Sequence, residues 1–227
     1  MTIRIVLADD QELIRAAFRV LIDLEADLEV VGEADDGQAA IDLLKTERAD
    51  VVLMDIRMPG LDGLEATHRI CADEDLAGVK VLILTTFEVD EYVFKALQSG
   101  ASGFLGKGTA PDRLLDAIRV VASGDSLLSP AATQSLIARF LAQPDPVATP
   151  RSLDEGPMRR LTERERQIVS LVAQGLTNDQ IAEQLYLSPL TVKTHVNRSM
   201  TKIDVRDRAQ LVVAAYQSGL VIATAGQ

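Results

Sequence analysis

Residues 50–63 read DVVLMDIRMPGLDG, and this stretch indicates the fold of the first half of the chain. Its residues Val51–Met54 form an apolar run with no polar position, and the run ends at Asp55. A strand that is apolar at every position is buried on both faces, as in a parallel sheet covered by helices. We therefore expect a parallel α/β sheet with Asp55 at the carboxyl end of one strand.

Similar apolar runs lie on either side of this stretch and alternate with segments of helical periodicity. The predicted strands are Ile3–Ala8, Leu28–Ala34, Val51–Met54, Val79–Leu84 and Gly103–Leu105. The predicted helices are Gln11–Leu24, Gly37–Glu47, Leu64–Cys71, Asp90–Ser99 and Pro111–Ser123. Five such pairs predict a doubly wound α/β domain with a five-stranded parallel sheet.

Four of these strands are followed by acidic, hydroxyl or basic side chains. Asp9 and Asp10 follow the first strand and Asp55 the third, while Thr85 follows the fourth and Lys107 the fifth. The functional crevice of a doubly wound sheet lies at the carboxyl ends of its strands. We expect all five side chains to converge there.

Three carboxylates at one crevice repel one another unless a cation neutralises them. Mg²⁺ prefers carboxylate and water oxygens, so Asp9, Asp10 and Asp55 are predicted to hold Mg²⁺. One carboxylate can then attack phosphorus and form an acyl phosphate. Lys107 would stabilise charge on the transferring phosphoryl oxygens, and the Thr85 hydroxyl would donate a hydrogen bond to the product.

Each of these residues also has a purely structural interpretation. Aspartates after strands are often turn formers or helix caps. A single lysine is more often a solvated surface charge, and a threonine at a strand end more often satisfies the backbone. The joint pattern is harder to explain in this way, because the acids, the hydroxyl and the lysine each occupy the end of a strand.

The segments VLADDQELIR, DVVLMDIRMPGLDG, VLILTTFEVDEYVFKAL and SGASGFLGK resemble a response-regulator receiver domain over roughly residues 1–125. The resemblance implies a flavodoxin-like fold in which a sensor histidine kinase phosphorylates Asp55. It implies that Asp9, Asp10 and Asp55 hold Mg²⁺ together with the backbone carbonyl of Arg57.

The same resemblance implies a switch beside the phosphoryl group. Thr85 and Lys107 would contact that group, and Phe104 would turn into the space that Thr85 leaves; the alternative is that Phe104 is simply a core aromatic. One departure from the family pattern is that Gly106 and Gly108 flank Lys107. Glycine adds backbone freedom, which bears on the rigidity of this loop.

A second domain is expected after a linker. Residues 126–157 contain a predicted helix, Pro130–Leu141, followed by a stretch with four prolines that suits neither helix nor strand. The predicted organisation is a domain at 1–125, a helix and linker at 126–157, and an all-α domain at 158–227.

The composition supports this division and excludes some classes of protein. Residues 1–150 carry 13 Lys and Arg against 26 Asp and Glu, whereas residues 151–227 carry 10 against 8, so the two halves suit different partners. Cys71 is the single cysteine, which argues against a disulfide or a cysteine-rich zinc site. We expect a cytoplasmic protein with no leader peptide and no membrane span, because no apolar run reaches about 18 residues.

The second domain is predicted to contain a helix-turn-helix. Leu161–Val172 has helical periodicity, and Thr162 with Glu165 fits a capping box. Gly175 ends that helix and Thr177 caps the next one. After a short turn, Ser188 followed by proline is a strong helix-start signal. Two short helices joined by a tight turn are typical of a helix-turn-helix.

The third helix of this domain has a polar face and a core face. Val192, Val196 and Ile203 are expected to face the core. Its polar side chains suit phosphates and base edges, with Lys193 for guanine or phosphate and Asn197 for adenine or phosphate. The candidate DNA-binding residues are Thr191, Lys193, Thr194, Asn197, Arg198 and Lys202. The alternative is a small helical bundle whose polar face is merely solvated.

Leu161–Val221, which includes LTERERQIVSLVAQGLTNDQIAEQL and SPLTVKTHVNRSMTKI, closely resembles a LuxR-type DNA-binding domain. The whole chain is thus similar to NarL/FixJ-type regulators. The resemblance implies that Lys193, Thr194 and Asn197 read double-stranded DNA and that the helix Asp207–Ser218 mediates dimerisation. A homodimer formed on phosphorylation would bind a roughly palindromic operator.

Two rival functions remain open at this point. An aspartyl-phosphate phosphatase usually needs a second acid two residues after its nucleophile, and Arg57 occupies that position. A DNA binder with a vestigial receiver domain is the other alternative, and the complete set of acids, hydroxyl and lysine argues against it. We expect a regulator that is not a turnover enzyme and that loses its phosphoryl group slowly.

Overall fold

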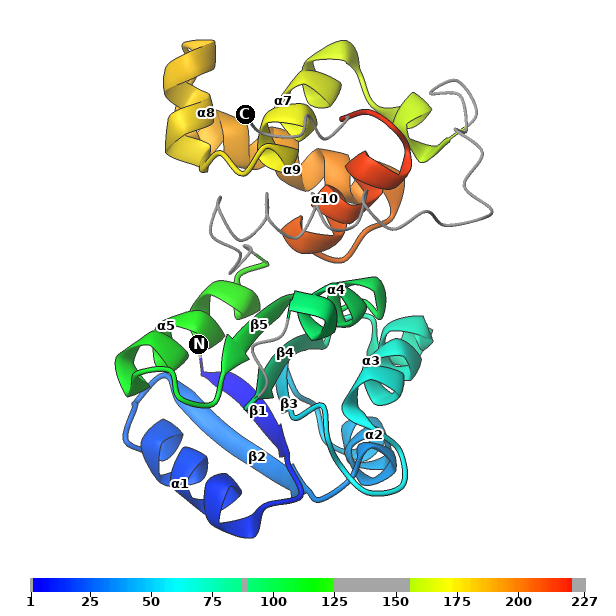
Figure 1. Cartoon of the computed structure of the whole chain (residues 1–227). Helices are drawn as coiled ribbons and strands as arrows, with labels where there is room; N and C mark the ends of the chain where they lie inside the picture. The colour runs from blue at the N-terminus through cyan, green and yellow to red at the C-terminus, as the bar shows by residue number, and fades with distance from the viewer. Residues whose placement is uncertain (1, 87–89, 125–155, 222–227) are drawn as a thin grey trace. The chain divides into compact units, whose positions relative to one another are not determined.

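The computed structural model describes residues 2–86, 90–124 and 156–221. The chain divides into two compact units, Met1–Leu127 and Leu128–Gln227 (Figure 1). Each unit has its own core and is described by itself. The helix predicted at Pro130–Leu141 lies outside the described residues.

The first unit is a five-stranded parallel sheet with helices on both faces (Figure 1). Its strands run in the order β2-β1-β3-β4-β5, which is the order of a flavodoxin-like doubly wound sheet. The strands are β1 Ile3–Ala8, β2 Leu28–Ala34, β3 Val51–Met54, β4 Lys80–Thr85 and β5 Gly103–Gly106. The helices are α1 Glu12–Asp23, α2 Gly37–Thr46, α3 Gly63–Ala72, η1 Glu74–Leu76, α4 Asp90–Gln98 and α5 Pro111–Ala122.

Alternate residues of each central strand supply two separate cores. Ile5 and Leu7 of β1 pack in one cluster with buried residues of α1 and α5. Val6 and Ala8 pack in the other with residues of α2, α3 and α4. Because both faces of the sheet are covered, β3 is buried at every position, which explains its unbroken apolar run.

Helix α1 has apolar residues on two faces. The spacing that predicted it included Leu13, Val20 and Leu24, yet these side chains are 84, 64 and 77 % exposed. The helix packs on the sheet through Ile22, through Phe18 and, among the residues whose spacing predicted it, through Leu21. The periodicity therefore predicted the helix correctly, but it did not predict which face is buried.

The second unit is entirely helical in its described part (Figure 1). Its elements are η2 Pro157–Arg160, α7 Glu163–Ala173, α8 Asn178–Leu185, α9 Pro189–Ile203 and α10 Arg208–Gln217. Thr162 and Thr177 cap α7 and α8, each in a capping box, and Ser188 caps α9. These caps satisfy backbone N–H groups that the first turns leave without partners, so they fix where each helix starts.

One apolar cluster holds this unit together. Val192 and Val196 of α9 are buried in it, as expected, with the last residue of α9, Ile203. The phenol of Tyr216 in α10 donates a hydrogen bond to the carbonyl of Ala173 at 3.1 Å, and burial raises the pKa of this phenol. In the part of the chain that the structure describes, no helix is long and apolar enough to cross a membrane.

Candidate functional sites

The predicted carboxylates meet at the carboxyl edge of the sheet. Asp9, Asp10 and Asp55 each offer an oxygen, and these oxygens lie within 4.8 Å of one another. They meet because β1 and β3 are neighbours in register, with Ala8 opposite Met54. The acids that follow these two residues must then lie side by side. Asp9 and Asp55 are each only 4 % exposed, whereas Asp10 is exposed.

Lys107 reaches into the same cluster from the end of β5. Its Nζ lies 2.6 Å from Oδ2 of Asp9 and 2.8 Å from Oδ2 of Asp55. The backbone N–H of Lys107 donates to the carbonyl of Thr85 at 2.8 Å, which anchors the lysine to β4. Although burial opposes the charge, hydrogen bonds with the two carboxylates raise the pKa of Lys107.

One ammonium is shared by more than one carboxylate, and this imbalance sets the electrostatics of the cluster. Burial raises the pKa of Asp55, and repulsion from Asp9 adds to the rise, while Lys107 works in the opposite direction. The cluster thus has more negative charge than its lysine neutralises. Such a group of oxygens suits a hard divalent cation.

Arg15 is part of this site, and the sequence analysis did not single it out. Its Nη1 donates to the backbone carbonyl of Asp9 at 2.5 Å, and its Nε pairs with Glu33 of β2 at 3.3 Å. Arg19, one turn later in α1, also pairs with Glu33, and its other ion pair is with Asp23 and not with Asp9. Arg15 thus ties α1 to the loop that carries the acids. The sequence does not distinguish an arginine that contacts a backbone carbonyl from an arginine on the solvated side of a helix.

The loop after Asp55 depends on close backbone packing. The N–H of Gly63 donates to the carbonyl of Ile56 at 2.9 Å, which places the start of α3 against the end of β3. A Cβ atom at position 63 would lie 1.8 Å from the carbonyl oxygen of Asp55, a contact that no side chain tolerates. Gly60 has φ +69°, the left-handed region that glycine adopts without strain. The two glycines of the PGLDG segment are therefore required by geometry.

Thr85 and Phe104 lie on adjacent strands beside the acidic cluster. Thr85 is the last residue of β4, where the prediction had placed it just after the strand, and it is fully buried. In the register between β4 and β5, Phe104 lies opposite Ile83, two residues before Thr85. Phe104 is partly buried and packs against the core cluster on that face.

Arg57 joins the loop after Asp55 to helix α4. Its side chain is exposed, and its Nη2 donates to the hydroxyl of Tyr92 at 3.2 Å. The guanidinium carbon also lies 6.0 Å from the centre of the tyrosine ring. This contact links the segment that follows Asp55 to α4.

The two glycines beside Lys107 do not need to be glycines for conformational reasons. Neither Gly106 nor Gly108 has a positive φ, and a Cβ at position 108 would meet nothing within 4 Å. The turn after Lys107 is closed by a hydrogen bond from the N–H of Thr109 to the carbonyl of Gly106 at 3.0 Å. The loop is therefore held by backbone hydrogen bonds at both ends.

The second candidate site is the exposed side of α9. Thr194, Asn197 and Arg198 are exposed, whereas Thr191 and Lys193 are partly buried. The N–H of Thr191 donates to the Ser188 hydroxyl at 3.1 Å, so this residue also belongs to the helix cap. Five of the six residues predicted to bind DNA thus lie on the accessible side of α9 or at its start.

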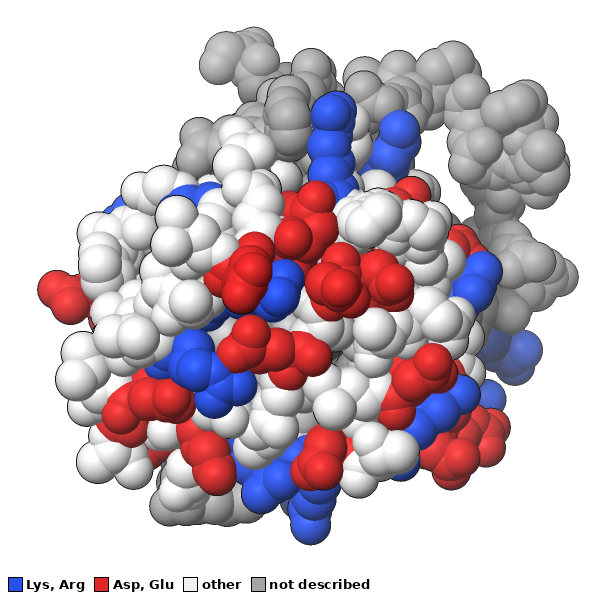
Figure 2. Space-filling view, turned by 90° about the horizontal axis from the view of Figure 1, so that it is seen from below, with Lys and Arg blue, Asp and Glu red and all other residues white. Residues whose placement is uncertain are grey.

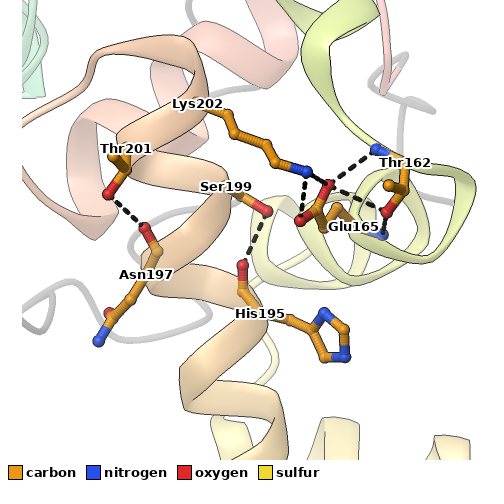
Figure 3. Close-up of polar contacts among 7 residues, drawn as sticks. All are labelled: Thr162, Glu165, His195, Asn197, Ser199, Thr201 and Lys202. Carbon is orange, nitrogen blue, oxygen red and sulfur yellow. Dashed lines mark hydrogen bonds and ion pairs between the residues drawn. The ribbon is translucent and has the colours of Figure 1, made fainter.

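Lys202, the sixth, points elsewhere. Its Nζ lies 2.8 and 2.6 Å from the two carboxylate oxygens of Glu165 in α7, which is buried (Figure 3). Glu165 also accepts the N–H and the hydroxyl of Thr162. Although burial opposes ionisation, these hydrogen bonds, that from Lys202 first, lower the pKa of Glu165. Sequence reasoning assigned Lys202 to the polar face because a helical spacing does not reveal a partner on another helix.

Figure 3 also separates the two sides of α9. The side chain of Asn197 extends away from Lys202 and Glu165, and the imidazole of His195 lies on a different side from Asn197. The Nδ1 atom of His195 is buried and has no hydrogen-bond partner among the described residues. One ring nitrogen of His195 is therefore turned toward the protein.

The surface charge follows the asymmetry of the sequence. Figure 2 shows one face on which Asp and Glu side chains gather in several groups, with Lys and Arg between them. Some charges of the first unit are paired, such as Arg119 of α5 with Asp27 at 2.8 Å and with Glu25 at 2.6 Å. Acidic residues of residues 1–150 outnumber basic ones two to one, so the first half keeps a large negative excess.

Both halves of the chain match known families. Residues 5–119 match the family described as the response regulator receiver domain, and residues 159–215 match the bacterial regulatory proteins of the luxR family. The uncharacterized transcriptional regulatory protein YxjL of Bacillus subtilis is 41 % identical, over 96 % of this chain and 97 % of its own length. The response regulator protein VraR of Staphylococcus aureus is 34 % identical, over 97 and 100 %.

Two solved structures of response regulators are also similar to this chain. The response regulator ChrA of a heme-sensing two-component system is 34 % identical with a TM-score of 0.50, covering 97 % of this chain and 99 % of that one. The receiver domain of the response regulator NarL from Mycobacterium tuberculosis is 36 % identical with a TM-score of 0.52, covering 54 and 98 %.

Proposed function

Because the chain belongs to the two-component response regulators that join a receiver domain to a LuxR-type DNA-binding domain, we propose that Asp55 is its phosphoacceptor. The observation that carries the proposal is the position of Asp55 Oδ2, 2.8 Å from Lys107 Nζ and inside a group of three carboxylates. The phosphoryl donor is the phosphohistidine of a sensor histidine kinase. The family is one of transcriptional regulators and not of turnover enzymes.

The donor set at this pocket fits Mg²⁺. The three carboxylates offer oxygen ligands within 4.8 Å of one another, and Asp10 is exposed, which leaves a path for a hydrated cation. Asp9, Asp10, Asp55 and the backbone carbonyl of Arg57 would hold the ion. When bound, it neutralises charge on the carboxylates and on the incoming phosphoryl oxygens.

The protein groups have distinct parts in the transfer. A carboxylate oxygen of Asp55 forms a bond to phosphorus as the bond from phosphorus to the kinase histidine breaks, and that histidine nitrogen keeps the electron pair. Lys107 moves its contact from the carboxylates to the phosphoryl oxygens, where its ammonium stabilises their charge. Arg15 holds the carbonyl of Asp9, which keeps the acidic loop in place during the step.

Phosphorylation then changes the surface of the receiver domain. The hydroxyl of Thr85 moves toward the phosphoryl group, and Phe104 turns into the vacated space. Arg57 lies two residues after Asp55 and contacts Tyr92, so α4 is coupled to the same change. The altered surface favours a homodimer or frees the DNA-binding domain. The acyl phosphate is lost slowly by hydrolysis, which resets the switch.

Intact-mass measurement tests the phosphoacceptor. The full chain incubated with acetyl phosphate and Mg²⁺ should gain one adduct of about 80 Da. The Asp55→Asn variant should gain none, and a chelator should prevent the gain in the natural chain. An adduct that survives in Asp55→Asn would place the acceptor elsewhere. No adduct at all would favour a vestigial receiver domain.

A steady-state assay separates the regulator from a phosphatase. With a phosphomonoester in excess, a regulator releases at most one slow equivalent of phosphate for each chain. Arg57 stands where such a phosphatase usually has its second acid, so we expect no sustained turnover. Continuous release that depends on Asp55 would overturn the assignment.

The DNA-binding domain reads a roughly palindromic operator as a dimer, in the cytoplasm. Helix α9 enters the major groove, where Lys193, Thr194 and Asn197 contact bases and Thr191 and Arg198 contact the backbone. Lys202 is assigned to the packing of α9 on α7, since Glu165 holds its ammonium. The predicted dimer element is α10, whose buried residues include Leu211 and Val212 of the same chain's core, so only its outer side remains for a partner.

Genome-wide binding maps of the natural chain and of Asp55→Asn test the link between the two domains. We expect occupied sites that share one inverted repeat, with occupancy that falls in the variant. Equal occupancy in both would disconnect phosphorylation from DNA binding.

A further inference from the structure

Two large apolar side chains are strongly exposed in the second unit. Tyr186, the left-handed C-cap of α8, is 96 % exposed, and Leu190, the second residue of α9, is 74 % exposed. The start of a helix is often fastened by an apolar pair around the cap, and here those positions are Leu187 and Val192, both of which pack in the core cluster. Leu190 is therefore not needed for the fold at this helix start.

Leu190 lies on the side of α9 opposite the core. The buried residues Val192, Val196, Ser199 and Ile203 recur at helical spacing and form one face. Two residues correspond to about 200° around the helix, so positions two residues earlier form the opposite face. That face is a ridge of exposed side chains, which we call the outer ridge: Leu190, Thr194, Asn197 and Thr201.

The hydroxyl groups of the outer ridge are turned toward the helix backbone. Oγ1 of Thr194 donates to the carbonyl of Leu190 at 2.9 Å. Oγ1 of Thr201 donates to the carbonyl of Asn197 at 3.1 Å (Figure 3). Each hydroxyl has thus used its one hydrogen on its own helix. From its N-terminal end, the ridge offers an isobutyl group, then a threonine, and then the amide of Asn197.

In a helix-turn-helix, the N-terminal residues of the second helix meet the base edges in the major groove. The apolar group that bases offer there is the 5-methyl of thymine. Resting on the proposed DNA-binding function, we propose that Leu190 is a specificity-determining residue that packs against a thymine methyl in each operator half-site. Asn197 lies about 10 Å further along the helix, or roughly three base-pair steps, and its amide suits adenine.

The first step of the test is to obtain the operator. The full chain, treated with acetyl phosphate and Mg²⁺, selects duplexes from a random pool, and the selected consensus is resynthesised. Each thymine is then replaced singly by deoxyuridine, which removes the methyl group and leaves the base pairing intact. Affinity is measured by fluorescence anisotropy at one fixed salt concentration, because binding to DNA depends strongly on salt.

We expect one thymine in each half-site at which deoxyuridine weakens binding of the natural chain about fourfold, the value for burying one methyl-sized group. The Leu190→Ala variant should bind the thymine and deoxyuridine duplexes equally well at that position. It should otherwise fold normally, because the side chain that is shortened is 74 % exposed. Circular dichroism and the unfolding temperature check this.

Asn197→Ala serves as the matched control on the same ridge. It should weaken binding overall but keep the full deoxyuridine penalty, since Leu190 remains. A penalty that persists in Leu190→Ala, or no penalty at any thymine, overturns the inference while leaving the DNA-binding function intact. Failure to select any consensus counts against the proposed function itself, and the assignment of Leu190 falls with it.

Discussion

Each of the two units contains a contact between a lysine and a buried carboxylate, and the two contacts have nearly the same length but different consequences. In the receiver domain, Lys107 lies 2.6 Å from Asp9 and 2.8 Å from Asp55. In the DNA-binding domain, Lys202 lies 2.6 and 2.8 Å from the two oxygens of Glu165. The distance between lysine and carboxylate therefore does not distinguish a functional pocket from an ion pair that only stabilises the fold.

The difference lies in the ratio of charges and in the hydrogen bonds around them. Glu165 has one lysine and the hydroxyl and N–H of Thr162, so its charge is fully matched and its pKa is lowered in spite of burial. Asp55 shares its lysine with Asp9, and its pKa is raised. Binding an ion or a phosphoryl group stabilises a site whose charges are not balanced. A balanced pair is not stabilised by such a ligand, and it contributes to stability only while both partners are present.

The largest effect should come from breaking the matched pair. Glu165→Ala removes the partner of Lys202 and half of the capping box, and we expect the DNA-binding domain to lose about 2–3 kcal/mol of unfolding free energy. Calorimetric unfolding of the full chain, with one transition for each domain, measures this. Glu183→Ala, an exposed acid on α8, is the control and should change stability by less than about 0.5 kcal/mol. Equal losses in the two variants would refute the structural role of the pair.

The next largest effect should be on the Mg²⁺ affinity of the acidic cluster, and it should depend on Arg15. Arg15→Gln removes the hydrogen bond to the carbonyl of Asp9, and we expect Mg²⁺ affinity to fall about tenfold, as for other residues that orient metal ligands. Arg19→Gln loses its contact with Glu33 but not one with Asp9, so its affinity should be unchanged. Isothermal titration calorimetry with Mg²⁺ alone gives the comparison. If both variants bind alike, α1 has no part in holding the acidic loop.

The contributions of Asp55 and Glu165 to the pH dependence of stability should have opposite signs. Because the pKa of Asp55 is raised above 3.8, the folded receiver domain without metal holds more protons, and its contribution to stability falls as pH rises through the folded pKa. Because the pKa of Glu165 is lowered from 4.5, its contribution is present above about pH 4.5 and is lost as pH falls through the folded value.

These two contributions are isolated by difference from Asp55→Asn and Glu165→Gln, with a chelator present. Above pH 3.8, unfolding temperatures should show that the stability of the natural receiver domain rises relative to that of Asp55→Asn as the pH falls. The natural DNA-binding domain should lose its advantage over Glu165→Gln below about pH 4.5. Slopes of the same sign would show that the two pockets do not differ in the way described.

The smallest effect concerns the loop of Lys107. Gly108→Ala meets no atom within 4 Å and needs no positive φ, so it should stabilise the receiver domain by about 0.4–1 kcal/mol through the unfolded chain. Its rate of phosphorylation by acetyl phosphate should stay within twofold of the natural rate. A large loss of rate would mean that the freedom of this glycine is used during the transfer.

Much of the receiver domain followed from the sequence because its signals are local. β1, β2 and β3 have the predicted bounds, since apolar runs that end in acids leave little choice of boundary. The convergence of Asp9, Asp10 and Asp55 followed from the rule that parallel strands end at one edge. The capping boxes of Thr162 and Thr177 are similarly local, because cap and partner lie three residues apart.

What the sequence could not supply are contacts between distant segments. The exposed face of α1 with Leu13 and Val20 was indistinguishable from its buried face, because both carry apolar residues at helical spacing. The bond from Arg15 to the carbonyl of Asp9 depends on a backbone atom, which no residue type reveals. The ion pair of Lys202 with Glu165, 37 residues away, was likewise not predicted from the sequence.

The contact between Arg57 and Tyr92 gives the protein a built-in optical reporter. The chain has no tryptophan and three tyrosines, so Tyr92, Tyr186 and Tyr216 dominate its ultraviolet emission. Tyr92 hydrogen-bonds to a residue two positions after Asp55, whereas the other two belong to the DNA-binding domain. A change of charge at Asp55 should therefore alter the emission of Tyr92, while the emission of the two tyrosines in the DNA-binding domain changes less. The change can be followed without attaching a label.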